Sequence, residues 1–192
     1  MDGNVIIHYG IKGQKWGVRR FQNPDGTYTD LGKKRKSSRV FVSGSSKTQD
    51  PESKYYRQLP ETVKSALKDY VNQKASILIG DAPGIDRQVQ DYLKELGYQK
   101  VTVFGPGKQV RYQADSNWKS KTYDSNYEPY SPEWLAKKDK AMSRSATEGL
   151  AVTLDEGSKA TKNNIARLLA KGKPVKEYQL SKKGSKHDRW VR

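Results

Sequence analysis

Residues 77 to 86 read Ile77-Leu78-Ile79-Gly80-Asp81-Ala82-Pro83-Gly84-Ile85-Asp86, and the pattern changes partway along. The stretch begins as an apolar run of strand type and then breaks at a Gly- and Pro-containing turn. Apolar residues return with helical spacing at Ile85, Val89 and Leu93. In an open α/β sheet such a strand–turn–helix junction faces the crevice at the carboxyl ends of the strands. The free N–H groups of the helix start favour an anion such as phosphate. An ordinary turn without a ligand is the alternative, because one glycine-rich turn is a weak signal.

The same alternation of strand and helix runs through most of the chain. We expect strands at residues 39–46, 75–80, 100–104, 149–154 and 174–180, and helices at 61–71, 85–97, 131–146 and 164–170. This pattern predicts an α/β fold with three layers, α/β/α, around a five-stranded parallel sheet. Right-handed crossovers favour the strand order 3-2-1-4-5. The turns after strands one, two and four should then meet at one edge of the sheet.

Residues 105–131 interrupt the alternation and read as a long loop. The loop carries Arg111 and several lysines between aromatic residues, among them Tyr112, Trp118, Tyr127 and Tyr130. Loops of this length are uncommon unless they bind something or are disordered. Aromatic side chains interleaved with Lys and Arg can stack on a base and contact phosphate. A ligand-facing loop is therefore one interpretation, and a Tyr-rich lid packed on its own domain is the other.

The composition is strongly basic and lacks cysteine. The 192 residues include 37 Lys and Arg against 21 Asp and Glu, a formal net charge of +16, which suggests an anionic partner. The absence of Cys excludes disulfides, thiolate metal sites and a Cys nucleophile. His8 and His187 lie near the two ends, so a His triad or a multi-His metal site in the core is excluded. We expect no metal, no signal peptide and no membrane span.

The charge is unevenly distributed, which divides the chain into three parts. Residues 1–38 form a basic arm, residues 39–180 a domain, and residues 181–192 a basic tail that we expect to be mobile. Within the arm, residues 8–20 (His8 to Arg20), 23–27 and 31–35 resemble a short module of proteins encoded by tailed phages and prophages. That resemblance implies phage origin, contact with phage head proteins through residues 8–35, and a place in the host cytoplasm or packaged in the virion.

Residues 39–180 carry a second resemblance. The series Gly44-Ser45, Gly80-Asp81-Ala82-x-Gly84-x-Asp86, Asn117-Trp118, Lys138-Asp139-x-x-Met142 and Thr161-x-Asn163-Asn164 is similar to that of the SLOG superfamily of Rossmann-like nucleotide-binding domains. The branch described as nucleoside deoxyribosyltransferase-like is the most similar. The resemblance implies a nucleotide, NAD or ADP-ribose-type ligand, with no separate cofactor. It implies these ligand-binding residues: Gly44, Ser45, Gly80, Asp81, Gly84, Asp86, Asn117, Trp118, Asp155, Ser158 and Thr161.

One position departs from that pattern. Ala160 stands where relatives commonly have Gly, so a Cβ lies where the backbone would come closest to a phosphate. The signature Pro-Gly-Gly-x-Gly-Thr-x-x-Glu is also absent, which argues against phosphoribohydrolase activity of that kind.

Cleavage of an N-glycosidic bond needs a carboxylate to stabilise the sugar cation or to protonate the departing base. The candidate catalytic residues are Asp86, Asp155 and Glu156, with Asp81 as a further carboxylate of the turns. Capping of its helix, or an ion pair with Arg87, is the alternative role for Asp86.

Three functions stay open on the sequence alone. The first is a nucleotide-binding or nucleotide-cleaving protein that counters host defence, and the second is a nucleic-acid-binding protein. The third is a virion-associated structural or cargo protein without catalysis. The sequence is compatible with a homo-oligomer but does not determine one.

Overall fold

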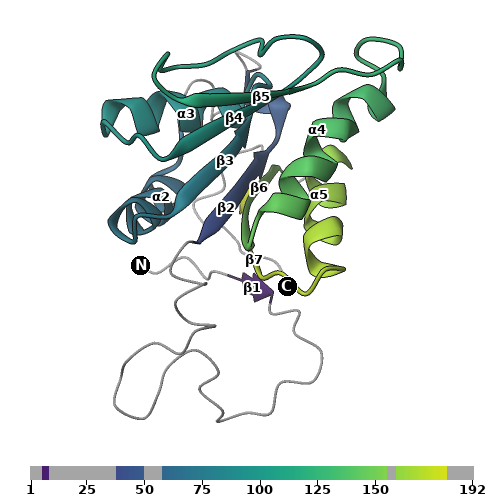
Figure 1. Ribbon diagram of the computed structural model, residues 1–192. Coiled ribbons are helices and arrows are strands. Elements are labelled where there is room, and N and C mark those ends of the chain that lie inside the picture. Colours follow the sequence, from purple (N-terminus) through teal and green to yellow (C-terminus); the bar gives the residue numbers. More distant parts are fainter. Residues whose placement is uncertain (1–5, 9–37, 50–57, 155–158, 181–192) are drawn as a thin grey trace, which may run out of the picture.

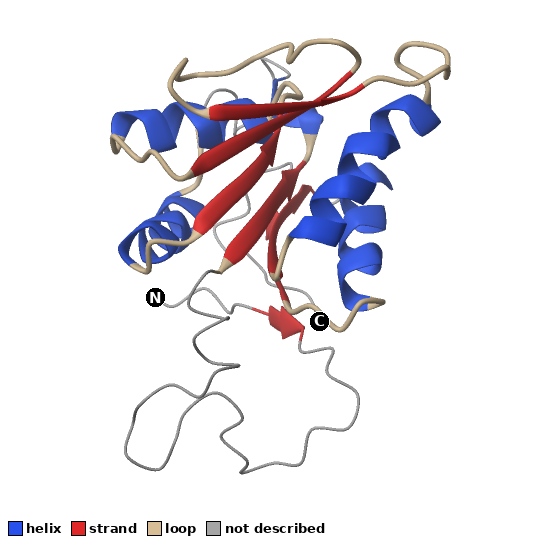
Figure 2. Ribbon diagram, viewed as in Figure 1, coloured by secondary structure: helices blue, strands red, loops and turns tan. Residues whose placement is uncertain are grey.

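A single β-sheet lies between two layers of helices in the computed structural model (Figures 1 and 2). The structure describes residues 6–8, 38–49, 58–154 and 159–180. The strands are β1 (Ile6–His8), β2 (Arg39–Gly44), β3 (Ser76–Gly80), β4 (Val101–Pro106), β5 (Lys119–Tyr123), β6 (Glu148–Leu154) and β7 (Val175–Leu180). The helices are η1 (Ser46–Gln49, a 3-10 helix), α2 (Glu61–Asn72), α3 (Ile85–Glu95), α4 (Pro132–Ser145) and α5 (Lys159–Leu169).

The strands follow the order β1-β7-β6-β2-β3-β4-β5. All neighbours from β7 to β5 are parallel, and β1 pairs with β7 in the antiparallel direction. The predicted order of the five central strands is therefore confirmed, as is the α/β class. The connection β2-α2-β3 runs to one side of β2, and β6-α5-β7 runs to the other. The switch point lies between β2 and β6, as the sequence predicts.

Two edge strands extend the predicted five-stranded sheet. β5 lies inside residues 105–131, for which the sequence predicted only a loop, and its first four residues are exposed. The sequence Lys-Ser-Lys-Thr-Tyr has no alternation of apolar and polar residues, because an edge strand exposed on both faces does not need one. At the opposite edge, three residues of the basic N-terminal arm form β1.

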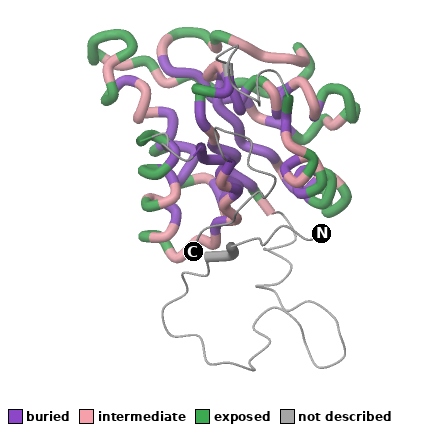
Figure 3. Tube along the Cα trace, turned by 180° about the vertical axis from the view of Figure 1, so that it is seen from behind, coloured by how far each residue is buried: buried purple, intermediate pink, exposed green. Residues whose placement is uncertain are grey.

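Apolar side chains fill both faces of the sheet. One core cluster joins the sheet to α2 and α3, with Val63, Leu67, Val89 and Leu93 facing inward from the two helices. A second, smaller cluster joins the sheet to α4 and α5. Figure 3 shows the buried residues gathered on the strands and the exposed ones on the outer sides of the helices.

Local signals explain where the helices begin. Ser131 caps α4, and its side chain accepts a hydrogen bond from the backbone N–H of Trp134 at 3.2 Å, with Pro132 in the first turn. α5 begins at Lys159, five residues before the predicted start. The prediction missed these residues because the first buried residue of the helix is the polar Thr161 and not an apolar one.

No helix of the described ranges is long and apolar enough to span a bilayer.

Candidate functional site

The exits of β2 and β3 meet the start of α3 at the switch point. The backbone N–H of Ser45 donates to the carbonyl oxygen of Val152 on β6 at 3.1 Å, and the carbonyl of Ser45 accepts from the N–H of Ile85 at 3.2 Å. The turn after β2 is thus fixed to both β6 and α3. Two of the three predicted turns therefore meet. The third turn, with Asp155, Glu156 and Ser158, lies outside the described residues.

A cavity of about 220 Å³ opens at this edge. It is lined by the end of β2, the turn before α3, one side of α4 and the first turns of α5. The lining residues that carry polar side chains are Ser43, Ser46, Asp86, Arg111, Lys138, Asp139, Thr161 and Asn164. Gly44, Asp86 and Thr161 are the predicted ligand-binding residues that line the cavity, and Ala160 borders it as well.

Two predicted glycines, Gly80 and Gly84, pack closely against residues that form the cavity wall or the neighbouring turn. A Cβ on Gly80 would lie 2.2 Å from Oδ2 of Asp86 and 2.7 Å from Nζ of Lys138. Gly84 has a φ of +84°, and a Cβ there would lie 2.6 Å from the carbonyl oxygen of Ser45. The resemblance to the SLOG superfamily implied that both glycines bind the ligand. In the structure the groups that come close are the chain's own, so each glycine positions the wall of the site.

A buried polar network connects the elements around the cavity. Nζ of Lys138 donates to Oδ1 of Asp139 at 3.0 Å, and both side chains are almost completely buried. Nδ2 of Asn164 donates to Oδ2 of Asp139 and to Oγ of Ser43, each at 3.0 Å. Nη1 of Arg167 donates to Oδ1 of Asn164 at 2.6 Å, which fixes the orientation of the amide. Side chains that also line the cavity therefore connect β2, α4 and α5 by hydrogen bonds.

Asp86 lies beside this network and is only 6% exposed. Burial raises the pKa of its carboxyl to about 7, although the charge of Lys138 lowers it. The neighbouring Asp139 raises it further, while the backbone N–H of Ala82, 3.4 Å from Oδ2, lowers it. Burial would lower the pKa of Lys138, but the carboxylates of Asp139 and Asp86 hold that pKa above its usual value. The site thus contains Lys138, which stays protonated at neutral pH, beside Asp86, whose carboxyl has a pKa near neutrality.

Asp81 is bound by the chain itself. Oδ2 accepts hydrogen bonds from the backbone N–H and from Nε of Arg111 at 2.9 and 3.1 Å, and Oδ1 accepts from Nη2 at 2.5 Å. The carboxylate is fully buried, so this bidentate pair fixes the guanidinium at the cavity wall. The predicted site residue Asp81 is thus bound within the chain, whereas Arg111, predicted only as part of a ligand-facing loop, lines the cavity.

Asn117 and Trp118 are not brought to the cavity. They lie at the amino end of β5, whereas the cavity lies at the carboxyl ends of the strands. The indole of Trp118 is 4% exposed and packs in the core, and its Nε1 donates to the carbonyl oxygen of Tyr98 at 2.8 Å. Asn117 is exposed. The physical reason is that a large apolar ring next to an exposed edge strand is most stable inside the core.

Sequence reasoning missed Lys138, Asp139 and Asn164 as site residues, although they belong to the series that resembles the SLOG superfamily. A signal for them exists. Lys138 lies four residues from both Trp134 and Met142, on the buried side of α4, where a charged residue is unexpected. Asn164 lies between Thr161 and Leu168 on the buried side of α5. A polar residue on the core side of an amphipathic helix indicates a buried partner.

Comparison with known proteins supports the fold. The chain is similar to the solved structure of DNA processing protein A from Helicobacter pylori, which is described for its single-stranded DNA binding mode. The TM-score is 0.50 at 15% sequence identity, over 71% of this chain and 62% of the other, so the match spans less than two thirds of that protein. No family model and no curated protein matches the chain. The fold is thus of the Rossmann-like class, and the resemblances to the SLOG superfamily and to the phage module stay predictions.

Within the described ranges, no group of three or more His, Cys, Asp or Glu side chains is arranged to hold a metal ion.

Proposed function

We propose that this chain binds a nucleotide-type ligand, such as a nucleotide, NAD or ADP-ribose, in the cavity at the switch point. The observation that carries the proposal is Asp86, a buried carboxyl on the cavity wall whose pKa is raised to about 7 beside a buried lysine. Strongly shifted carboxyls in a concave site at a topological switch point are typical of binding and catalytic centres.

The lining groups suit the parts of such a ligand. Asp86 and Asp139 offer acceptor oxygens for the hydroxyls of a ribose, and the protonated form of Asp86 can also donate. Arg111 uses two of its five side-chain N–H donors on Asp81, which leaves others for a phosphate. The first turn of α5 borders the cavity and adds the backbone N–H groups of a helix start. A cavity of about 220 Å³ is smaller than the ~300–1,000 Å³ of typical ligand sites, so we expect it to hold one sugar or base with the rest of the ligand outside.

Asp86 also suits a proton transfer. A carboxyl with a pKa of about 7 keeps part of its proton at neutral pH and can deliver it to a departing base. In this proposal Asp86 protonates the base as the N-glycosidic bond breaks, and a water molecule adds to the sugar cation and returns a proton to the site. Asp155 and Glu156 are the candidates for stabilising the sugar cation, and both lie outside the described residues. Chromatography of a purine nucleotide incubated with the protein distinguishes cleavage, which releases the free base, from binding alone.

Calorimetric titration with NAD, ADP-ribose and cyclic nucleotides tests the proposal. We expect saturable binding of at least one of them, and binding at least about tenfold weaker in Asp86→Asn, since a hydrogen bond to a charged group contributes about 1.5–3 kcal/mol. Glu95→Gln, at the far end of the same helix, removes one negative charge from an exposed position and should leave the affinity unchanged. Absence of binding to every ligand of the panel, or equal weakening by both variants, would contradict the proposal.

The biological setting follows from the N-terminal resemblance alone. If residues 8–35 are a phage module, the proposed role is to sequester or degrade a nucleotide signal of host defence. That segment lies outside the described residues apart from His8.

A further inference from the structure

The two helical layers of the protein differ in charge. Outside the buried Asp86, α2 and α3 carry four Lys or Arg and four Asp or Glu, so this layer is neutral. Outside the buried pair Lys138 and Asp139, α4 and α5 carry six Lys or Arg against the single Glu133. A domain that only needed solubility could distribute these charges over both layers. Their concentration on one layer indicates an anionic partner for that side.

Four cations of this layer are exposed and arranged in two short rows. Lys140 and Arg144 are one helical turn apart on α4, and Lys159 and Lys162 are nearly one turn apart on α5. We call these four residues the basic face. α4 and α5 lie side by side on the same face of the sheet (Figure 1). No carboxylate in the described part of the chain forms an ion pair with any of the four.

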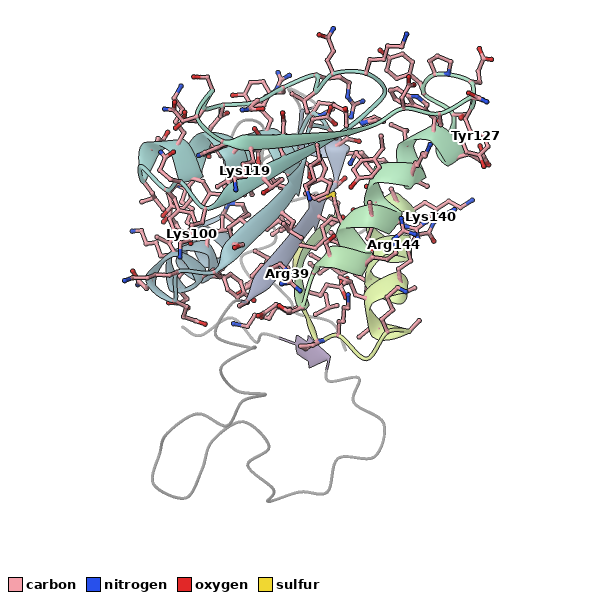
Figure 4. The ribbon with its side chains drawn as sticks, in the orientation of Figure 1. Arg39, Lys100, Lys119, Tyr127, Lys140 and Arg144 are labelled. Atoms are coloured by element: carbon pink, nitrogen blue, oxygen red, sulfur yellow. The ribbon has the colours of Figure 1, made fainter. Side chains whose placement is uncertain are left out.

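Exposed aromatic rings lie beside the start of α4. Tyr127 is 54% and Tyr130 is 70% exposed, and the Tyr130 ring lies on Trp134 with centroids 5.3 Å apart. Tyr130 has a φ of 67°, a left-handed conformation that is unfavourable for a bulky side chain. The chain thus holds a large ring in solvent at a strained position, as binding sites often do. Figure 4 shows Tyr127, Lys140 and Arg144 along the same side of the molecule.

We propose that the basic face and the two tyrosines form a binding surface for single-stranded nucleic acid. Phosphates contact the four cations, and unpaired bases stack on Tyr127 and Tyr130. The tyrosines favour a single strand over a duplex, because the bases of a duplex are already stacked and offer no free ring faces. The surface is built from different residues than the cavity, so this inference does not rest on the proposed function.

Fluorescence anisotropy with a labelled thymidine homopolymer, measured over a series of salt concentrations, tests the surface. The triple variant Lys140→Gln/Arg144→Gln/Lys162→Gln should reduce the slope of log affinity against log salt by about 2, since each phosphate contact on a single strand contributes about 0.7. The matched control is Lys68→Gln/Lys94→Gln/Lys100→Gln, which removes the same charge from exposed positions outside the basic face and should leave the slope unchanged. The basic tails are present in both proteins and cannot explain a difference between them.

A second variant tests the tyrosines. Tyr127→Ala/Tyr130→Ala should weaken binding at least about fivefold and leave the salt slope unchanged, because stacking involves no counterion release. Circular dichroism checks that each variant is folded. Equal slopes for the two triple variants, absence of binding, or equal affinity of the tyrosine variant and the parent would overturn the proposal, as would tighter binding of a duplex of the same length. Asp86→Asn should leave polymer binding unchanged, which separates this surface from the cavity.

Discussion

Replacing Asp86 with Asn is expected to stabilise the protein at and above pH 7 by about 4 kcal/mol, and to have little effect below pH 3.8. The pKa of Asp86 is about 7 in the folded protein and 3.8 for an ordinary aspartate, and each unit of difference corresponds to about 1.4 kcal/mol. Between these two values the folded protein keeps a proton that the unfolded chain has released. The unfolded chain then binds fewer protons, so the free energy of unfolding falls as the pH rises. Asn cannot ionise and removes this loss.

Denaturant unfolding at a series of pH values measures the effect. The difference between Asp86→Asn and the parent should rise from pH 3.8 to about 7 and stay constant above that. Glu95→Gln controls for the loss of one negative charge on the same helix. A difference that does not change with pH would show that Asp86 is not a desolvated carboxyl, and it would remove the main support for the proposed site. A destabilising carboxyl at a cavity is expected where function, and not stability, has selected the residue.

Gly84→Ala is expected to lower the free energy of unfolding by at least about 3 kcal/mol. Gly84 combines a φ of +84° with a ψ of −130°, a region that is essentially restricted to glycine, and such strain costs about 1–3 kcal/mol. A Cβ would also lie 2.6 Å from the carbonyl oxygen of Ser45 and 2.7 Å from Cα of Ser46. Both are backbone atoms of the β2 exit and cannot move without opening the junction between β2 and α3.

Gly97→Ala provides the comparison. Gly97 also has a positive φ, of +64°, but a Cβ there meets nothing within 4 Å. Its substitution should therefore cost only about 1 kcal/mol, from the left-handed backbone alone. Chemical denaturation of the two variants measures the difference. Similar losses for both would mean that the close approach at Gly84 is not part of the folded structure.

The sequence predicted the central sheet because its strands are buried on both faces. An apolar run such as residues 77–79 indicates a buried strand even when the neighbouring strands are unknown. The preference for right-handed crossovers then restricts the strand order. β5 could not be found in this way, since Lys119 and Lys121 stand on an exposed edge where no apolar pattern is required. The start of α5 was missed for a related reason, because polar residues occupy the inner side of its first turns.

The candidate site was only partly predictable. The turns at Gly44 and Gly80 were placed correctly, because the carboxyl ends of parallel strands share one edge. The partners of the carboxylates depend on three-dimensional packing. No local signal shows that Asp81 pairs with Arg111, thirty residues later, or that Asn164 joins Ser43 to Asp139. Trp118 illustrates the converse, since an aromatic ring in a basic loop can belong to the core.

The central claim, a nucleotide-type ligand in the cavity between β2, α3, α4 and α5, is tested most directly by amide NMR spectra recorded during a titration with ADP-ribose. The account predicts saturable shifts concentrated at residues 43–46, 82–86, 138–139 and 160–164, with little change along β5 or the outer sides of α2 and α3. Saturable shifts that avoid these four segments, or unchanged spectra with NAD and cyclic nucleotides as well, would contradict it.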